Sequence, residues 1–145
     1  MNIAALRLEH SAIMAQASRL MGVAGAVKTR GDAHDAVALI QGLDVLLRDH
    51  LAEEDEHLYP ALMAAGDEDT RRLGADAFDA MGGIVGAWAN YRDHWTLEAI
   101  LGEAGRFGAA TEGVIGALAL RIEMENGILY PAMERLTGGS ERAAA

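Results

Sequence analysis

The sequence predicts an all-α protein, a single bundle of four antiparallel helices that run up, down, up and down. Hydrophobic residues recur three and four positions apart along the chain, and no segment alternates as a half-buried strand would. Only two prolines occur in 145 residues, so helices are free to form over most of the chain. Short glycine-containing stretches divide it into four amphipathic segments, which pack best as a bundle. We expect the bundle at residues 1–137 and a flexible C-terminal tail at 138–145.

The first two helices are predicted from their apolar faces and from the residues that interrupt them. The face of the first helix holds Ile3, Leu6, His10, Ile13, Ala17 and Leu20. Glycines between residues 22 and 31 end this helix, and Asp32 is suited to cap the next one. The face of the second helix holds Ile40, Leu43, Leu47, His50, Glu54, His57 and Ala61. Pro60 and the turn at 66–69 mark its end.

The third helix is predicted from a face that holds Ala77, Met81, Ile84, Trp88, Tyr91 and Trp95. We expect its aromatic side chains to pack in the core, whereas an exposed one would mark the surface of a homodimer or of another protein partner. Breakers at Gly102, Gly105 and Gly108 separate this helix from the fourth. The face of the fourth helix holds Thr111, Val114, Leu118, Arg121, Glu125, Ile128 and Ala132.

Composition excludes several functions. The net charge of −10 argues against a nucleic-acid partner, because phosphate binding needs clustered Lys and Arg. The absence of cysteine excludes disulfides, thiolate metal ligands and cysteine nucleophiles. Charged residues interrupt the N-terminal apolar run, and no segment is long and apolar enough to cross a membrane, so we expect a cytoplasmic protein with no signal peptide. No phosphate-binding loop or serine nucleophile is apparent, which favours a binding or regulatory domain over an enzyme.

Five polar residues occupy positions on these faces that should be apolar, namely His10, His50, Glu54, Arg121 and Glu125. His50 and Glu54 lie four residues apart, as do Arg121 and Glu125, so each pair shares one side of its helix. Counted from the turns, the polar positions fall at a similar height in the bundle. Two carboxylates buried in one layer need a metal ion, an arginine or protons to neutralise them. This layer is therefore the main functional prediction.

The second and fourth helices carry matching motifs. Glu54 is followed by Leu-Tyr-Pro at 58–60, and Glu125 by Leu-Tyr-Pro at 129–131, with six residues from Glu to Pro in both. We expect the two tyrosines to pack at the helix ends, with their hydroxyls toward water or a backbone carbonyl. Together with Leu-Glu-His-Ser at 8–11, these motifs resemble those of the hemerythrin family, the HHE cation-binding domains, over nearly the whole chain.

The resemblance implies a hemerythrin-like bundle, in which the family holds two bridged irons with five histidines and two carboxylates. It also implies a function in oxygen binding, in oxygen or nitric-oxide sensing, or in the repair of iron centres. Carried over to this chain, the ligand positions are His10, His50, Glu54 and Glu125. His57, one turn beyond Glu54 in a regular helix, is a candidate fifth ligand, although its counterpart Ile128 favours a structural role.

Two departures from the family pattern reduce the ligand set. Arg121 stands one turn before the carboxylate of the fourth helix, where the family has a histidine. The third helix, which normally supplies at least one histidine, has Met81 and Ile84 at this height. Other candidate ligands of that helix lie about 15 Å further along it or off its apolar face, namely His94, Asp76 and Asp79. We therefore expect one iron ion or none, and not a full di-iron centre.

Two hypotheses follow for the neutralising charge. In the first, the four ligands bind one ion, a set acceptable to Fe(II), Mn(II) or Zn(II). In the second, the guanidinium of Arg121 replaces the metal by pairing with Glu54 and Glu125, and the protein is a metal-free regulatory or protein-interaction module. A third interpretation has the head of Arg121 extend past its stem to solvent. The residues leave these alternatives open.

Overall fold

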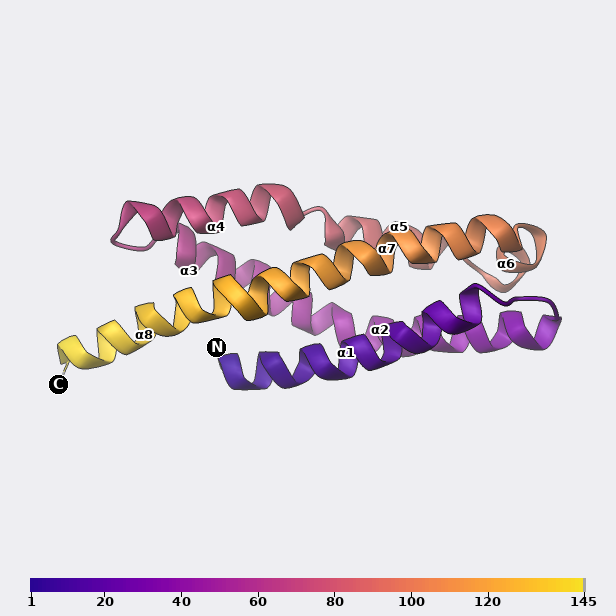
Figure 1. Cartoon of the computed structure of the whole chain (residues 1–145), viewed down its shortest axis with the longest axis horizontal. Coiled ribbons are helices and arrows are strands. Elements are labelled where there is room, and N and C mark those ends of the chain that lie inside the picture. The colour runs from indigo at the N-terminus through magenta and orange to yellow at the C-terminus, as the bar shows by residue number, and fades with distance from the viewer. Residues whose placement is uncertain (145) are drawn as a thin grey trace.

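Four long helices run alternately up and down the molecule, which confirms the predicted fold class (Figure 1). The structure, a computed structural model, describes the backbone of residues 1–144 and the side chains of residues 1–138. The first long helix is α1 (Ile3–Ala24), and the second comprises α2 (Arg30–Glu53), η1 (Glu54–Leu58) and α3 (Tyr59–Met63). The third comprises α4 (Glu68–Met81) and α5 (Ile84–His94), and the fourth α7 (Ala104–Met124), η2 (Glu125–Leu129) and α8 (Tyr130–Ala144). The tail expected at 138–145 lies almost wholly outside the described side chains, and its flexibility stays a prediction.

The start of α2 corrects the predicted cap. Thr29, not Asp32, is the N-cap residue, and its side chain accepts a hydrogen bond from the backbone N–H of Asp32 at 3.1 Å. The Asp32 carboxylate accepts in return from the backbone N–H of Thr29 at 3.0 Å. This reciprocal capping box satisfies two N–H groups that the first turn leaves without helical partners, and it places Asp32 inside the helix at its third position.

The third long helix is interrupted, which the sequence analysis did not predict. Its two parts, α4 and α5, are separated by Gly82 and Gly83. A Cβ atom at position 82 would lie 2.6 Å from the carbonyl oxygen of Phe78, so this backbone path requires glycine. The interruption leaves the Met81 carbonyl at the end of α4, where it is free to accept a hydrogen bond from a neighbouring helix.

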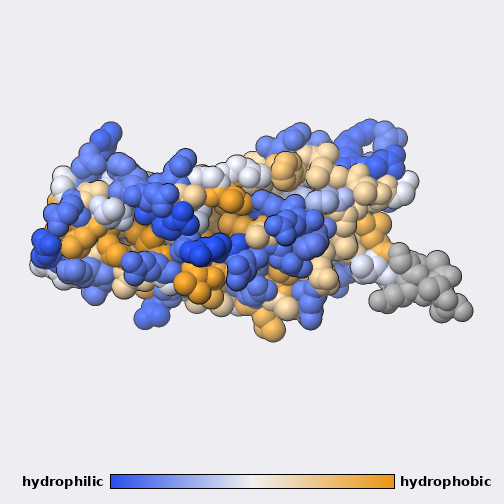
Figure 2. Space-filling model, turned by 180° about the vertical axis from the view of Figure 1, so that it is seen from behind, coloured by the Kyte–Doolittle hydropathy of each residue, from blue (hydrophilic) through white to orange (hydrophobic). Residues whose placement is uncertain are grey.

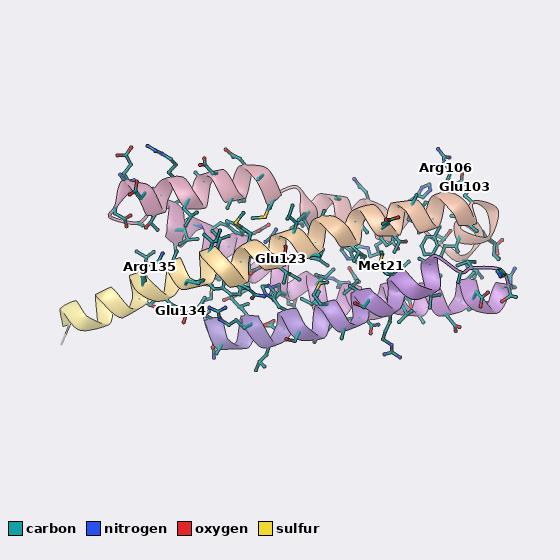
Figure 3. The ribbon with its side chains drawn as sticks, in the orientation of Figure 1. Met21, Glu103, Arg106, Glu123, Glu134 and Arg135 are labelled. Atoms are coloured by element: carbon teal, nitrogen blue, oxygen red, sulfur yellow. The ribbon has the colours of Figure 1, made fainter. Side chains whose placement is uncertain are left out.

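The connection to the fourth long helix also differs from the prediction. A short helix, α6 (Leu97–Gly102), lies in it, and Glu103 and Arg106 form a 2.8 Å ion pair where α6 leads into α7 (Figure 3). Gly105 and Gly108 lie inside α7 and do not break it. A Cβ at Gly108 would lie 3.3 Å from the Ala24 carbonyl, so this glycine allows close packing between helices.

Two π-helical turns, η1 and η2, begin at Glu54 and Glu125. The matching motifs of the second and fourth long helices therefore adopt the same local structure. In each turn the N–H of the tyrosine before the proline donates to the carbonyl of the glutamate five residues earlier. Proline has no N–H, and its ring clashes with the carbonyl four residues before it, so a widened turn ahead of it avoids that clash. The second helix therefore passes through Pro60 and ends at Met63, between the proline and the turn at 66–69 that were predicted to mark its end.

Each π turn moves the buried face by one residue. Regular helical spacing places His57 and Ile128 on the buried face, but both are exposed, and Ile128 keeps 44% of its surface accessible. The next residue in each helix, Leu58 or Leu129, is fully buried instead. The prediction of a continuous 3.6-residue stripe was wrong at positions 57 and 128, because a π turn contains one extra residue.

The aromatic face of the third helix packs in the core, as predicted, since Trp88, Tyr91 and Trp95 are all buried. A buried carboxylate that the sequence analysis missed supports this packing. Asp44 of α2 accepts hydrogen bonds from the Trp88 indole N–H and from Arg92, both at 2.9 Å. These contacts tie α2 to α5 with no unpaired charge.

On the face of the molecule shown in Figure 2, hydrophilic residues interrupt the exposed hydrophobic ones. Among the described helices, none is both long enough and apolar enough to cross a membrane. The buried aromatic residues are not available as the partner surface considered for them, so a homodimer or another protein partner stays a prediction.

Candidate metal centre

The structure brings the four predicted ligand residues together in the core. His10 comes from α1, His50 from α2, Glu54 from the start of η1 and Glu125 from the start of η2. Each offers one donor atom, and these atoms all lie within 4.8 Å of one another. No residue of the four is more than 2% exposed. Two imidazoles and two carboxylates at such separations can bind a single metal ion.

His10 is oriented by a residue that the sequence analysis missed. Its Nδ1 lies 2.8 Å from the side-chain oxygen of Asn126, and its Nε2 lies 3.1 Å from Oε1 of Glu125. With the Asn126 amide oxygen as partner of Nδ1, Nε2 is the ring nitrogen that faces the layer of carboxylates and would bind a metal ion. Metal-binding histidines are commonly fixed in this way, through a hydrogen bond from the other ring nitrogen.

His50 is fully buried but poorly satisfied. Its Nε2 lies 3.2 Å from Oε1 of Glu54, and its Nδ1 lies 3.5 Å from Oε1 of Glu9, yet neither nitrogen has a hydrogen bond of acceptable geometry. Buried polar atoms without partners are rare in folded proteins and call for a specific explanation. Metal coordination would supply the missing partner of Nε2.

Arg121 lies in the same layer and is 0% exposed, so the interpretation in which its head reaches solvent was wrong. Its Nε donates to Oε2 of Glu125 at 3.0 Å, and its Nη2 lies 3.4 Å from Oε1 of Glu54. Its Nη2 also donates to Asp55 at 2.9 Å, a contact that the sequence analysis missed. Asp55 lies in the π turn η1, which directs its carboxylate toward Arg121 of α7.

The third helix contributes a backbone atom in place of a histidine. Nη1 of Arg121 donates to the carbonyl of Met81 at 3.4 Å, at the point where α4 ends. The polar side chains of this helix lie outside the layer, as predicted, because Asp76, Asp79 and His94 are exposed. The side of the layer that faces the third long helix is thus occupied by the guanidinium of Arg121.

The hydroxyls of the paired tyrosines donate to the two glutamate carboxylates. The prediction that they reach water or a backbone carbonyl was wrong. The Tyr59 hydroxyl donates to Oε2 of Glu125 at 2.9 Å, and the Tyr130 hydroxyl donates to Oε2 of Glu54. The Tyr130 oxygen also lies 3.0 Å from Nε2 of His10. Burial raises the pKa of both phenols, so both hydroxyls keep their protons and act as donors.

The two glutamates have different electrostatic surroundings. Burial raises the pKa of Glu54, and the negative charge of Glu125 adds to this effect. Burial alone would also raise the pKa of Glu125, but the hydrogen bond to His10 and the charge of Arg121 hold it below its usual value. Arg121 therefore compensates Glu125 more fully than Glu54, and the end of the layer with Glu54 and His50 keeps the less compensated negative charge.

His57 is not part of the centre, which corrects the candidate fifth ligand. Its side chain is 57% exposed and lies 3.7 Å from the carboxylate of Glu53 on the outside of the bundle. The cause is the π turn η1, which rotates position 57 away from the core and brings Leu58 inward.

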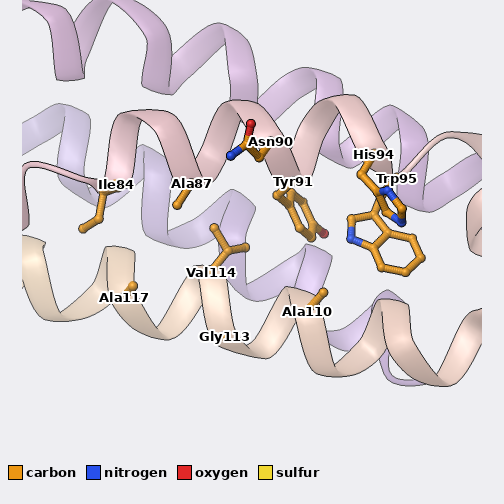
Figure 4. A pocket seen from close by; sticks show the side chains of 10 residues that line it. All are labelled: Ile84, Ala87, Asn90, Tyr91, His94, Trp95, Ala110, Gly113, Val114 and Ala117. Atoms are coloured by element: carbon orange, nitrogen blue, oxygen red, sulfur yellow. The ribbon is translucent and has the colours of Figure 1, made fainter.

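A separate groove of about 400 Å³ lies between α5 and α7. Figure 4 shows Tyr91, His94 and Val114 among the mostly apolar side chains that line it. None of the four candidate metal ligands lines this groove. It is therefore distinct from the metal centre.

The whole layer lies within a region that matches a known family model. The model, described as hemerythrin HHE cation binding domain, matches residues 1–133, which include all four candidate ligands. Among curated proteins and among solved structures, none matches the chain.

Proposed function

The chain belongs to the hemerythrin HHE cation-binding domain family, and from this premise we propose that it binds one divalent metal ion in the core of its bundle. The ligands in this proposal are His10, His50, Glu54 and Glu125. The metal is iron, and Arg121 takes the place of the second ion. The bound ion would make the protein an oxygen or nitric-oxide sensor or a related cytoplasmic regulatory domain, as the family resemblance implies.

The observation that carries this proposal is the balance of charge in the layer. Three carboxylates surround one guanidinium, because Asp55 joins Glu54 and Glu125 around Arg121. When both histidines are neutral and all three carboxylates are ionised, as metal ligation requires, two negative charges are left over, which is the charge of one divalent cation. Arg121 and a metal ion are therefore compatible neighbours, since the carboxylates outnumber the guanidinium.

The chemistry of the donors supports the same stoichiometry. His10 presents Nε2 while Asn126 binds its other nitrogen, and His50 has a buried nitrogen without a partner. Neutral imidazoles and carboxylates suit Fe(II), Mn(II) and Zn(II), and the family resemblance favours iron among these. When bound, such an ion would supply redox or ligand-binding chemistry, whereas the protein residues hold it, orient its ligands and exclude water.

One observation favours a second candidate function, a metal-free regulatory module. Arg121 contacts both Glu54 and Glu125, as expected if its guanidinium replaces the metal. In this alternative, protonation of Glu54, whose pKa is raised, would remove a further negative charge. The histidines would then be structural, and the function would reside in protein contacts.

A metal count separates the two candidates. The protein is incubated anaerobically with Fe(II) and desalted, its iron is measured by mass spectrometry, and its visible spectrum is recorded before and after exposure to air. We expect about one ion per chain for the wild type and for His57→Ala, and almost none for His50→Ala. Two ions with an oxo-bridged absorption band would contradict the role of Arg121, and negligible iron in the wild type would favour the metal-free alternative.

A further inference from the structure

We propose that a hollow between α1 and α2, lined by Glu9, Asp49 and Glu53, is the entrance through which a hydrated divalent cation reaches the metal centre. This inference rests on the proposed function, because it concerns how the ion arrives at that centre. It assigns a role to exposed residues that take no part in the ligand set.

The hollow has the size and charge for such a role. Its volume is about 300 Å³, enough for an ion with its bound water, which occupies about 30 Å³ per molecule. The described residues that line it are Asn2, Ala5, Leu6, Glu9, Asp49 and Glu53, which include three carboxylates and no Lys or Arg. A concave surface with charges of one sign concentrates ions of the opposite sign and speeds their association.

One buried side chain contacts both the hollow and the centre. Nδ1 of His50 lies 3.5 Å from the carboxylate of Glu9, which lines the hollow, and Nε2 of the same ring lies 3.2 Å from Glu54 in the core. The ring is 2% exposed, and neither nitrogen is held by a hydrogen bond. Packing and the nearby carboxylates, without a hydrogen bond, keep His50 in place, and a rotation of its side chain would open the way from Glu9 to Glu54.

Two other sides of the layer carry a guanidinium. Between α1 and the fourth long helix, Arg7 lies over the Tyr130 ring, donates to the Asn126 carbonyl at 3.1 Å and pairs with Glu134, which is labelled in Figure 3. On the side facing α4, Arg121 fills the space next to the partly exposed Asp55. A cation that approached either side would meet a guanidinium first, whereas the hollow offers only carboxylates.

The test measures how fast Co(II), chosen for its visible absorption when bound, enters the metal-free protein in a stopped-flow instrument. The double variant Asp49→Asn with Glu53→Gln removes two charges from the hollow without touching a ligand. The matched control, Asp79→Asn with Glu112→Gln, removes two exposed charges from α4 and α7. Circular dichroism and melting curves verify that both variants fold, and the final amount of bound Co(II) distinguishes slow entry from a lost centre.

At low ionic strength we expect the hollow variant to take up Co(II) about ten-fold more slowly than the wild type, with the control close to the wild type. The difference should shrink at high salt, because the steering charges are screened. Equal rates for the hollow variant and the control would overturn the entrance while leaving the metal centre in place. Failure of the wild type to bind Co(II) after long incubation would overturn the proposed function together with its entrance.

Discussion

Nε of Arg121 lies 3.0 Å from Oε2 of Glu125, and both side chains are fully buried within one helical turn of each other. The same guanidinium contacts Glu54 and Asp55 from the second long helix and the Met81 carbonyl from the third. One cation thus connects three of the four long helices at the level of the metal centre. Its permanent charge is present whether or not a metal is bound.

Removing this charge should destabilise the metal-free protein strongly. We expect Arg121→Ala to lower the free energy of unfolding at neutral pH by about 3–5 kcal/mol, because it leaves buried carboxylates without compensation. Urea denaturation measures the change. Arg72→Ala, which breaks an exposed pair with Glu68, serves as the control and should have little effect. A variant at position 121 as stable as the wild type would show that protons neutralise the layer.

Arg121→His should strengthen metal binding. It replaces a permanent positive charge next to the ion with a neutral donor that the family uses at this position. We expect affinity for Zn(II) to rise about ten-fold or more, equal to about 1.4 kcal/mol, in competition with a chelator. Arg106→His at the far end of the bundle controls for the substitution itself. Weaker binding in Arg121→His would mean that the guanidinium supports the ion through the ligands it positions.

Asn126→Ala tests the orientation of His10. Without the amide oxygen 2.8 Å from Nδ1, the ring loses the partner that directs Nε2 toward the carboxylates. Loss of such outer partners typically lowers metal affinity 10–100-fold, and we expect a decrease of about this size in the chelator competition. Asn90→Ala removes an exposed amide from α5 and should leave the affinity unchanged. Wild-type affinity in Asn126→Ala would assign the orientation of His10 to packing against the Tyr130 ring.

Asp44 should make stability depend on pH in the acid range. Burial alone would raise its pKa, but hydrogen bonds from Trp88, Arg48 and Arg92 lower the pKa to about 2 from an ordinary 3.8. Because the folded value is the lower one, this stabilisation is present above about pH 4 and is lost as the pH falls toward 2. Its size is on the order of 2 kcal/mol. Urea unfolding at pH 5 and pH 2.5 should show a smaller loss in Asp44→Asn than in the wild type, and equal losses would refute the assignment.

Two neighbouring alanine variants test the register after the π turn. Leu129 is fully buried and Ile128 is 44% exposed, although regular helical spacing places position 128 on the buried face. We expect Leu129→Ala to cost about 2–5 kcal/mol of stability, and Ile128→Ala much less, because only the first opens a cavity in the core. Thermal and urea denaturation measure both. The reverse order would indicate a regular helix through this segment.

Local spacing was sufficient to predict the four helices and the layer that His10, His50, Glu54 and Glu125 form. Residues four apart share a helix face whatever surrounds them, and two helices with the same Glu and Leu-Tyr-Pro spacing place their carboxylates alike. The same reasoning failed at His57 and Ile128, because it assumed regular turns up to each proline. The prolines were visible in the sequence, but the π turns that accommodate them shift the face by a residue that periodicity does not count.

The amino-acid sequence by itself therefore determined the bundle and the chemical character of its polar layer, since both follow from repeats within single helices. Tertiary structure alone decided which groups surround the charges of that layer. The partners of Arg121 include Asp55 and the Met81 carbonyl, and the partner of His10 is Asn126, contacts made between different long helices. Such contacts depend on the crossing and rotation of packed helices and on the end of α4 at Gly82, none of which the spacing within one helix specifies.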